Sequence, residues 1–148
     1  MKIRKAKKRD IGRCIDIAKS LEEWLTGEGV DACIREMPEL EVYVYDDEKI
    51  LGFIAYRDKG KEVAEIAWFG VERGSHRKGV GTALLNYLES QLPEKKMLVL
   101  KTVDESVDKN LYEAKTRFYQ KNGFIKVDTL EGLQYWSFPC AVYIKSLR

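Results

Sequence analysis

The chain has 148 residues, of which 45% are hydrophobic and 34% charged, and its formal net charge is +2. This length and composition predict one ordinary domain, residues 1–148, with a core of its own. The near-neutral total does not indicate a nucleic-acid binder, and the longest apolar runs, such as IAWFGV, are too short to span a bilayer. Three scattered cysteines, no CxxC pair and one histidine give no zinc pattern and favour a reduced, cytoplasmic protein without a metal.

The first third of the chain predicts one strand and two helices, at residues 2–6, 11–21 and 30–37. Asp10 stands where its side chain can cap the first helix, whose apolar residues recur at helical spacing. Gly27 and Gly29 are expected to end that helix, because glycine is a poor helix former.

The rest of the chain is predicted to be rich in strands. β-branched and aromatic residues bounded by turn residues predict an antiparallel meander at 41–45, 50–57 and 62–71. Two helices and three strands follow, at residues 80–92, 96–103, 111–122, 124–127 and 140–147. Gly123 is expected in the left-handed position after the second of these helices. This order predicts an α/β or α+β fold with a mixed sheet.

The stretch GSHRKGVGTALL, residues 74–85, leads from a strand into a helix. The first N–H groups of a helix have no partner inside it and carry partial positive charge, so such a junction can bind an anion. Gly79 and Gly81 would let a pyrophosphate approach the main chain, and Arg77 and Lys78 would attract it. The loop fits neither GxxxxGK[ST] nor GxGxxG, and an ordinary turn stays open as the alternative.

Two segments together resemble the GNAT superfamily of N-acetyltransferases. VERGSHRKGVGTALL is similar to its acyl-CoA-binding segment, Arg/Gln-x-x-Gly-x-Gly/Ala, and RFYQKNGF is similar to its second hallmark, a Phe-Tyr pair followed by Gly-Phe. The resemblance implies the GNAT fold, with a splayed, mostly antiparallel sheet of about six to seven strands and about four helices. It also implies acetyl-CoA as co-substrate. His76 departs from the pattern, because the family has Arg or Gln there.

The resemblance implies a cofactor site at the end of one strand and in the loop after it. Main-chain groups of Phe69 and Val71 are expected to bind the pantetheine arm, with Gly70 favouring a bulge between them. Asn110 is a candidate for CoA contact or for capping the last helix. We expect His76→Arg to retain or strengthen CoA binding and Gly79→Val to weaken it severely. The predicted cofactor-binding residues are Phe69, Gly70, Val71, His76, Arg77, Lys78, Gly79, Val80, Gly81, Thr82, Asn110 and Tyr112.

Acetyl transfer to an amine needs a base for the amine proton and an acid for the leaving thiolate. The resemblance implies that Tyr119 points at the thioester sulfur, and a phenol with a pKa near ~10 holds its proton at neutral pH. Glu65, eleven residues before His76, is the candidate base, as a strand glutamate at this spacing is in histone-acetylating relatives. The alternatives are a tyrosine that only packs, a solvated carboxylate, and bulk water as the base.

The acceptor region is predicted to be acidic and aromatic. Residues 22–48 hold ten acids against Arg35 alone, and Trp24, Tyr43, Tyr45 and Trp68 accompany them. Carboxylates attract a cationic amine and aromatic rings hold it, which predicts a basic acceptor. The acids can instead balance the basic residues at the start of the chain.

Two other functions stay open, a CoA binder without catalysis and a nucleic-acid module that uses the segment KIRKAKKRD. The expected partners are acetyl-CoA and an amine acceptor, without nucleic acid or membrane, and a homodimer is possible.

Overall fold

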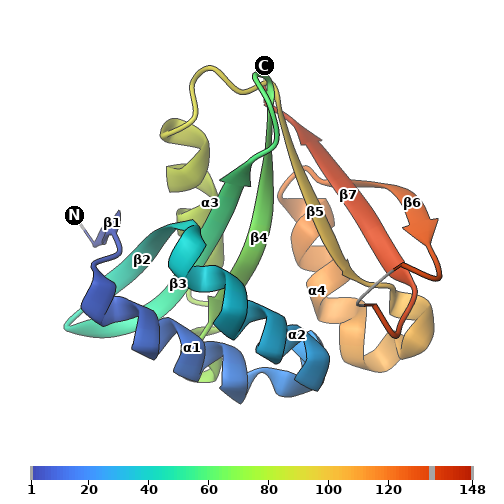
Figure 1. Cartoon of the computed structure of the whole chain (residues 1–148), viewed down its shortest axis with the longest axis horizontal. Coiled ribbons are helices and arrows are strands. Elements are labelled where there is room, and N and C mark those ends of the chain that lie inside the picture. Colours follow the sequence, from blue (N-terminus) through green and yellow to red (C-terminus); the bar gives the residue numbers. More distant parts are fainter. Residues whose placement is uncertain (1, 134–135, 148) are drawn as a thin grey trace. The chain divides into compact units, whose positions relative to one another are not determined.

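The structure is a computed structural model that describes residues 2–133 and 136–147. Within those residues it has seven strands, which are hydrogen-bonded in the order β1-β2-β3-β4-β5-β7-β6, and four α-helices. The open, mostly antiparallel sheet confirms the predicted mixed fold (Figure 1). The strands are β1 (Ile3–Lys5), β2 (Glu41–Asp47), β3 (Lys49–Asp58), β4 (Val63–Val71), β5 (Met97–Val103), β6 (Ile125–Leu130) and β7 (Cys140–Ser146). The helices are α1 (Ile11–Ser20), α2 (Glu22–Glu36), α3 (Val80–Ser90) and α4 (Lys109–Lys121).

The chain divides into two compact units, which we describe separately. The N-terminal unit comprises Met1–Arg57 and Ile66–Glu94, and the C-terminal unit comprises Asp58–Glu65 and Lys95–Arg148. Among the described residues, no helix is both long enough and apolar enough to cross a bilayer.

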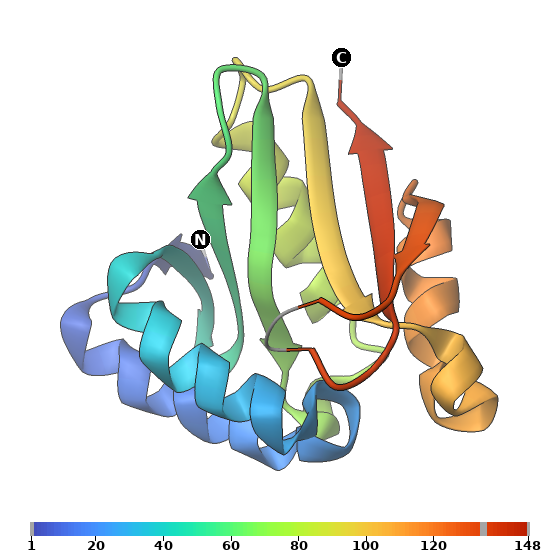
Figure 2. The same ribbon diagram turned by 45° about the vertical axis from the view of Figure 1, so that its right-hand side comes forward.

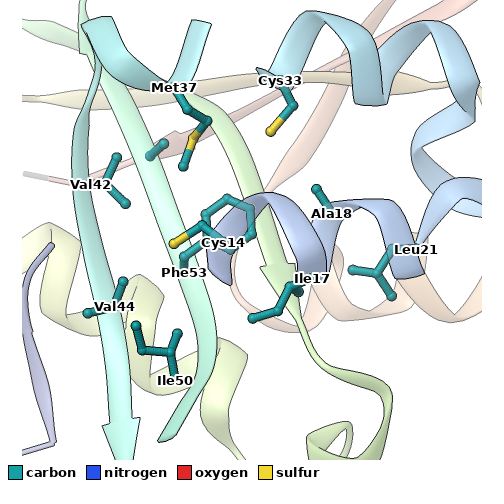
Figure 3. Close-up of a cluster of buried hydrophobic side chains, with 11 residues drawn as sticks. Cys14, Ile17, Ala18, Leu21, Cys33, Met37, Val42, Val44, Ile50 and Phe53 are labelled. Carbon is teal, nitrogen blue, oxygen red and sulfur yellow. The ribbon is translucent and has the colours of Figure 1, made fainter. Parts of the chain in front are cut away.

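The core of the N-terminal unit lies between α1, α2 and the strands β2 and β3. The two helices lie side by side against these strands in Figure 1. Val44 and Phe53 face each other in the antiparallel register of β2 and β3, and both are fully buried. Figure 3 shows Phe53 at the centre of the cluster, with Cys14 of α1 and Met37 pointing toward it. Burial of these apolar side chains is the main stabilising contribution of this unit.

The first helix ends at Ser20, one residue from the predicted limit, but the helix-breaking role expected of Gly27 and Gly29 is wrong. Gly27 and Gly29 lie inside α2, and the two breaks fall instead at Leu21, between α1 and α2, and at Thr26. Thr26 has φ 66° and ψ 160°, and its hydroxyl accepts a hydrogen bond from the N–H of Gly29 at 3.0 Å. The chain therefore turns just before the glycines and continues as a helix through them.

Two glycines let helices pack closely on both faces of the strands in the N-terminal unit. A Cβ on Gly70 would lie 2.9 Å from the ring of Phe53 and 3.4 Å from Ile17 of α1, so α1 covers this face. A Cβ on Gly52 would lie 3.1 Å from Val80 of α3. Glycine at 70 is thus required by close packing. These contacts place the first turn of α3 against β3.

The C-terminal unit is built from β5, β7 and β6 with α4 on one face (Figure 2). Leu100 of β5 pairs with Tyr143 of β7, and Tyr143 pairs with Lys126 of β6. The ring of Tyr143 lies 5.7 Å from that of Tyr119 on α4, so this set of residues faces the helix. Gly123, with φ 90°, follows α4 and confirms the predicted left-handed position.

Candidate active site

The loop before α3 has the geometry of an anion site made from main-chain groups. Gly79, with φ 80° and ψ 4°, is the N-cap residue of α3. Among the described residues, no side chain caps this helix and its first turn holds no acid. The first N–H groups of the helix, which include those of Val80, Gly81 and Thr82, therefore have no competing side-chain anion there. An added anion would meet both these donors and the helix dipole.

Arg77 and Lys78 are exposed in this loop, next to the helix end. Arg77 adopts φ 67°, which is a left-handed conformation that non-glycine residues rarely take. Alternation of left-handed residues with ordinary ones turns successive N–H groups toward one concave side, a geometry that binds anions. The backbone conformation and the two cationic side chains thus both favour an anionic ligand.

The end of β4 leads directly into this loop. Phe69 and Val71 are half-buried, and Gly70 between them is buried against α1. After Val71 the chain forms a single 3₁₀ turn, Arg73–Ser75, and then enters the loop. Seven of the predicted cofactor residues, from His76 to Thr82, are consecutive in the chain and begin five residues after this strand ends.

The side chain of His76 lies at the end of β4. Its Nε2 atom is 2.6 Å from the carbonyl oxygen of Val71, and its ring centroid is 5.6 Å from that of Trp24. Arg73 also packs over the ring of Trp24, with its Cζ atom 4.7 Å from the ring centroid. His76 is therefore engaged by the strand end and by α2.

Glu65 is buried on β4, so it is not the solvated carboxylate considered from the sequence. Its Oε2 atom lies 3.8 Å from Nζ of Lys101 on β5. The carboxylate therefore lies beside a cation.

Tyr119 is buried on α4 in an aromatic cluster. Its ring lies 5.7 Å from Phe124, 5.7 Å from Tyr143 and 5.6 Å from Phe118. Burial raises the pKa of the phenol above its usual value, and Tyr143 adds to that effect. The hydroxyl thus keeps its proton across the neutral range.

Glu65 and Tyr119 lie toward opposite faces of the C-terminal unit. Successive residues of a strand point to opposite faces of the sheet. Thr102 of β5 accepts a hydrogen bond from Lys115 of α4, so Thr102 faces that helix. Lys101, its neighbour, faces away and carries the contact with Glu65. The carboxylate is therefore on the face away from α4, and the phenol is on the face that α4 covers.

Comparisons with known proteins agree with this geometry. A model of the acetyltransferase (GNAT) domain matches residues 38–126. The chain belongs to the GNAT acetyltransferase family. The matched segment contains the loop, both candidate catalytic residues and the four strands β2 to β5.

Solved structures of other GNAT proteins have the same fold. A protein from Desulfovibrio desulfuricans assigned to the GNAT family is 18% identical, with TM-score 0.81 and coverage of 99% of this chain and 98% of that one. An aminoglycoside 6'-N-acetyltransferase in complex with coenzyme A is 22% identical, with TM-score 0.76 and coverage of 100% and 98%. Ard1 from Thermoplasma volcanium is 26% identical, with TM-score 0.75 and coverage of 99% and 97%. None of the curated proteins matches the chain.

Lys115 is a residue of this GNAT domain that the sequence analysis did not single out. Its Nζ atom lies 4.3 Å from the centroid of the Tyr112 ring and donates to the hydroxyl of Thr102. Burial lowers the pKa of the ammonium to about 8, although Asp104 opposes the shift. The sequence pattern that could have indicated it is the helical spacing, which places Lys115 on the same helix face as Tyr112 and Tyr119, both of which are buried.

The capping role considered for Asn110 is wrong. Asp108 is the N-cap residue of α4, and its side chain accepts a hydrogen bond from the N–H of Leu111 at 3.1 Å. Asn110 is exposed in the first turn of the helix. Tyr112, two residues later, is buried, and its pKa is raised by that burial and by Asp108. Cofactor contact by either residue stays a prediction.

Many acids of the 22–48 segment are paired within the GNAT domain. Glu36 accepts from Arg57 and from the indole of Trp68, the latter at 3.1 Å, and Glu23 pairs with Arg73. Three acids pair with the basic start of the chain, in the contacts Lys2–Asp47, Arg4–Asp46 and Lys5–Glu41. Three of the ten acids are therefore neutralised by the basic start of the chain, and two more by other arginines. Within residues 2–133 and 136–147, no group of three or more His, Cys, Asp or Glu side chains could hold a metal.

Proposed function

We propose that this protein transfers an acetyl group from acetyl-CoA to a primary amine by direct attack. The observation that carries the proposal is the N-terminus of α3, which follows a left-handed Gly79 and has neither a side-chain cap nor an acid among the described residues. The arrangement suits a pyrophosphate, because main-chain donors and the helix dipole both favour an anion there. Membership of the GNAT family makes an acyl-CoA the expected source of that pyrophosphate.

The cofactor is proposed to lie along the end of β4 and the loop after it. Main-chain groups of Phe69 and Val71 would bind the pantetheine arm, and the first N–H groups of α3 would bind the pyrophosphate. Arg77 and Lys78 would add attraction that weakens as salt is raised, because both side chains are exposed.

The acid and the base are proposed to act from opposite sides of the reacting thioester. The amine nitrogen attacks the acetyl carbonyl carbon, the C–S bond breaks, and CoA leaves as a thiolate. Glu65 takes the proton from the amine, directly or through water, and Tyr119 donates one to the sulfur. Their positions on opposite faces of the C-terminal unit support this assignment, since nucleophile and leaving group separate across the carbonyl carbon.

The raised pKa of Tyr119 has a consequence for its role. A phenolate would be costly in the buried site, so the phenol keeps its proton until negative charge develops on the sulfur and gives it up only as the thiolate leaves. Solvent then returns a proton to Tyr119.

The acceptor is proposed to be a basic small molecule or a lysine or N-terminal amine. Support comes from the acidic and aromatic side chains of α2 and β4, such as Glu36 beside Trp68. The internal ion pairs support the alternative that these acids balance the basic start of the chain. A screen with acetyl-CoA and amines, which measures the released thiol, decides whether the acceptor is basic or the acids only balance charge. Turnover with cationic amines and not with neutral or acidic ones is the expected result, and the reverse selectivity would refute a basic acceptor.

A second candidate function is CoA binding without catalysis. The same screen tests it, because a protein that binds CoA but releases no thiol with any amine would be a binder only. The nucleic-acid module is disfavoured because Lys2, Arg4 and Lys5 are all engaged with acids of β2. A homodimer and a reduced, cytoplasmic location stay predictions, and the three free, buried cysteines are consistent with the latter.

A further inference from the structure

His76 joins three segments of the N-terminal unit. It follows the 3₁₀ turn Arg73–Ser75 and precedes the residues of the anion site. Its Nε2 atom contacts the carbonyl of Val71, the last residue of β4, at 2.6 Å. Its ring packs against Trp24 of α2, with 5.6 Å between centroids and 42° between planes. A single exposed side chain therefore contacts the strand, the loop and the helix.

The contact with Val71 defines which nitrogen of the ring carries a proton. A carbonyl oxygen only accepts hydrogen bonds, so Nε2 must be the donor. This requires the Nε2–H tautomer or the doubly protonated ring.

Trp24 has a second contact in the same segment, with Arg73. Arg73 lies over its ring at 4.7 Å, donates to the carbonyl of Ser20 at 2.8 Å and pairs with Glu23. The indole therefore contacts two residues of the segment that connects β4 to α3, Arg73 and His76. The ring at position 76 supplies one of these contacts, and its nitrogen adds the link to the strand.

We propose that His76 is a positioning residue that orients the peptide group of Val71 and the loop leading to α3 through its Nε2–H, while Trp24 holds the ring in place. The proposal rests on the proposed function, because it assigns the Val71 peptide to the pantetheine arm. It differs from a direct role of His76 at the phosphates, because the side chain acts through Val71. Substitutions at 76 that remove the N–H donor should lower the affinity for CoA and raise the KM for acetyl-CoA, with a much smaller effect on kcat.

Four variants distinguish the contribution of the Nε2–H hydrogen bond from that of ring packing against Trp24. His76→Gln keeps an N–H donor near the position of Nε2. The shorter side chain of His76→Asn holds its N–H too close to its own backbone to reach the carbonyl of Val71. His76→Phe keeps the packing against Trp24 without a donor, and His76→Ala loses both. Loss of one hydrogen bond predicts CoA binding about fivefold weaker for Phe and Asn, and about tenfold weaker for Ala. His76→Gln should bind within about twofold of the wild type.

Calorimetric titration with CoA measures these affinities, and unfolding curves check that each variant is folded. Weakening in Phe and Asn with rescue by Gln supports the proposal. Equal or tighter binding by a folded His76→Phe would overturn it, since the ring nitrogen would then be irrelevant or would compete with the cofactor. Weakening in Gln equal to that in Ala would overturn it as well.

The tautomer provides a measurement that does not depend on activity. Because His76 is the only histidine of the chain, imidazole nitrogen spectra of the labelled protein contain one residue's signals. A proton on Nε2 in the free protein is the expected result, and an Nδ1–H tautomer would contradict the proposal. If wild-type protein failed to bind CoA, the proposed function would fail, while this spectrum would still report on the contact with Val71.

Discussion

The loop before α3 and the face of α4 that packs on β5 offer different kinds of chemical group. The loop offers main-chain N–H groups, and Arg77 and Lys78 beside them are exposed. The α4 face offers side chains, and its phenol and ammonium are both shifted in pKa by burial. Backbone donors keep the same chemistry in any environment, whereas side-chain acids and bases depend on what surrounds them. We therefore propose that the first region binds the cofactor and that the second supplies the general acid.

Removal of the Tyr119 hydroxyl tests the second region most directly. Tyr119→Phe should lower kcat about 100-fold at neutral pH, because general acids contribute this much, and CoA affinity should change little. Steady-state kinetics with the best acceptor of the screen measures both. Tyr143→Phe is the matched control, since it removes a neighbouring hydroxyl from the same aromatic cluster. An unchanged kcat for Tyr119→Phe across pH would rule out the general-acid role.

A side chain at Gly79 tests the first region. No atom lies within 4 Å of the position that a Cβ would take, so the cost comes from φ 80° and not from a clash. We expect Gly79→Val to weaken CoA binding about thirtyfold, because a β-branched residue avoids this conformation. Gly79→Asn should be much milder, since asparagine tolerates it. Gly74→Val is the control, because Gly74 has an ordinary φ and its nearest neighbour is 3.9 Å away. If all three variants bound CoA equally well, the proposed main-chain site for the pyrophosphate would be refuted.

The charges near α4 predict how stability depends on pH. Burial alone would raise the pKa of Asp104, but hydrogen bonds from Lys126 and Ser106 outweigh it and lower the pKa to about 2. A lowered carboxyl pKa stabilises the fold above the ordinary value and loses that contribution as pH falls from about 4 toward 2. Asp104→Asn should cost ~2 kcal/mol of unfolding free energy near neutral pH, and the difference should shrink in acid.

Urea unfolding at about pH 6 and about pH 3 measures this difference. Glu131→Gln, which changes an exposed carboxylate of the same unit, should show no such effect. A cost for Asp104→Asn that did not diminish in acid would show that the ion pair with Lys126 is not its source.

The smallest effect is expected at Lys115. The lowered pKa of this lysine means that the unfolded chain binds more protons between about pH 8 and 10, so stability should rise with pH there. Lys115→Met removes the cost of the buried ammonium and should stabilise the fold by about 1 kcal/mol at neutral pH. The gain should shrink at about pH 9.5, where the wild-type lysine is mostly neutral. A gain independent of pH would assign the effect to packing.

The same comparison explains what the sequence could predict. The loop was predictable because its glycines mark the start of a helix, with Gly79 as the N-cap residue and Gly81 in the first turn, and that requirement is local. The limits of the strands also follow from nearby residues and were predictable. The helix breaks were not, because they fall at Leu21 and Thr26 and not at Gly27 and Gly29. Lys115 escaped prediction because its low pKa depends on Thr102 and Tyr112, which only the fold brings to it. The link from His76 to Trp24 joins residues 52 positions apart, and no local pattern encodes it.

The buried cysteines give each unit an internal reporter of opening. Cys14 and Cys33 lie in the core of the N-terminal unit, where burial raises the pKa of both thiols to about 12, and Cys140 lies in the C-terminal unit. Because only an exposed thiolate reacts rapidly with an alkylating reagent, modification of the native protein must wait for a transient opening. Mass spectrometry of the alkylated peptides then gives a separate opening rate for each unit. A bound CoA that slows the reaction of Cys14 and Cys33 more than that of Cys140 would show which unit the cofactor stabilises.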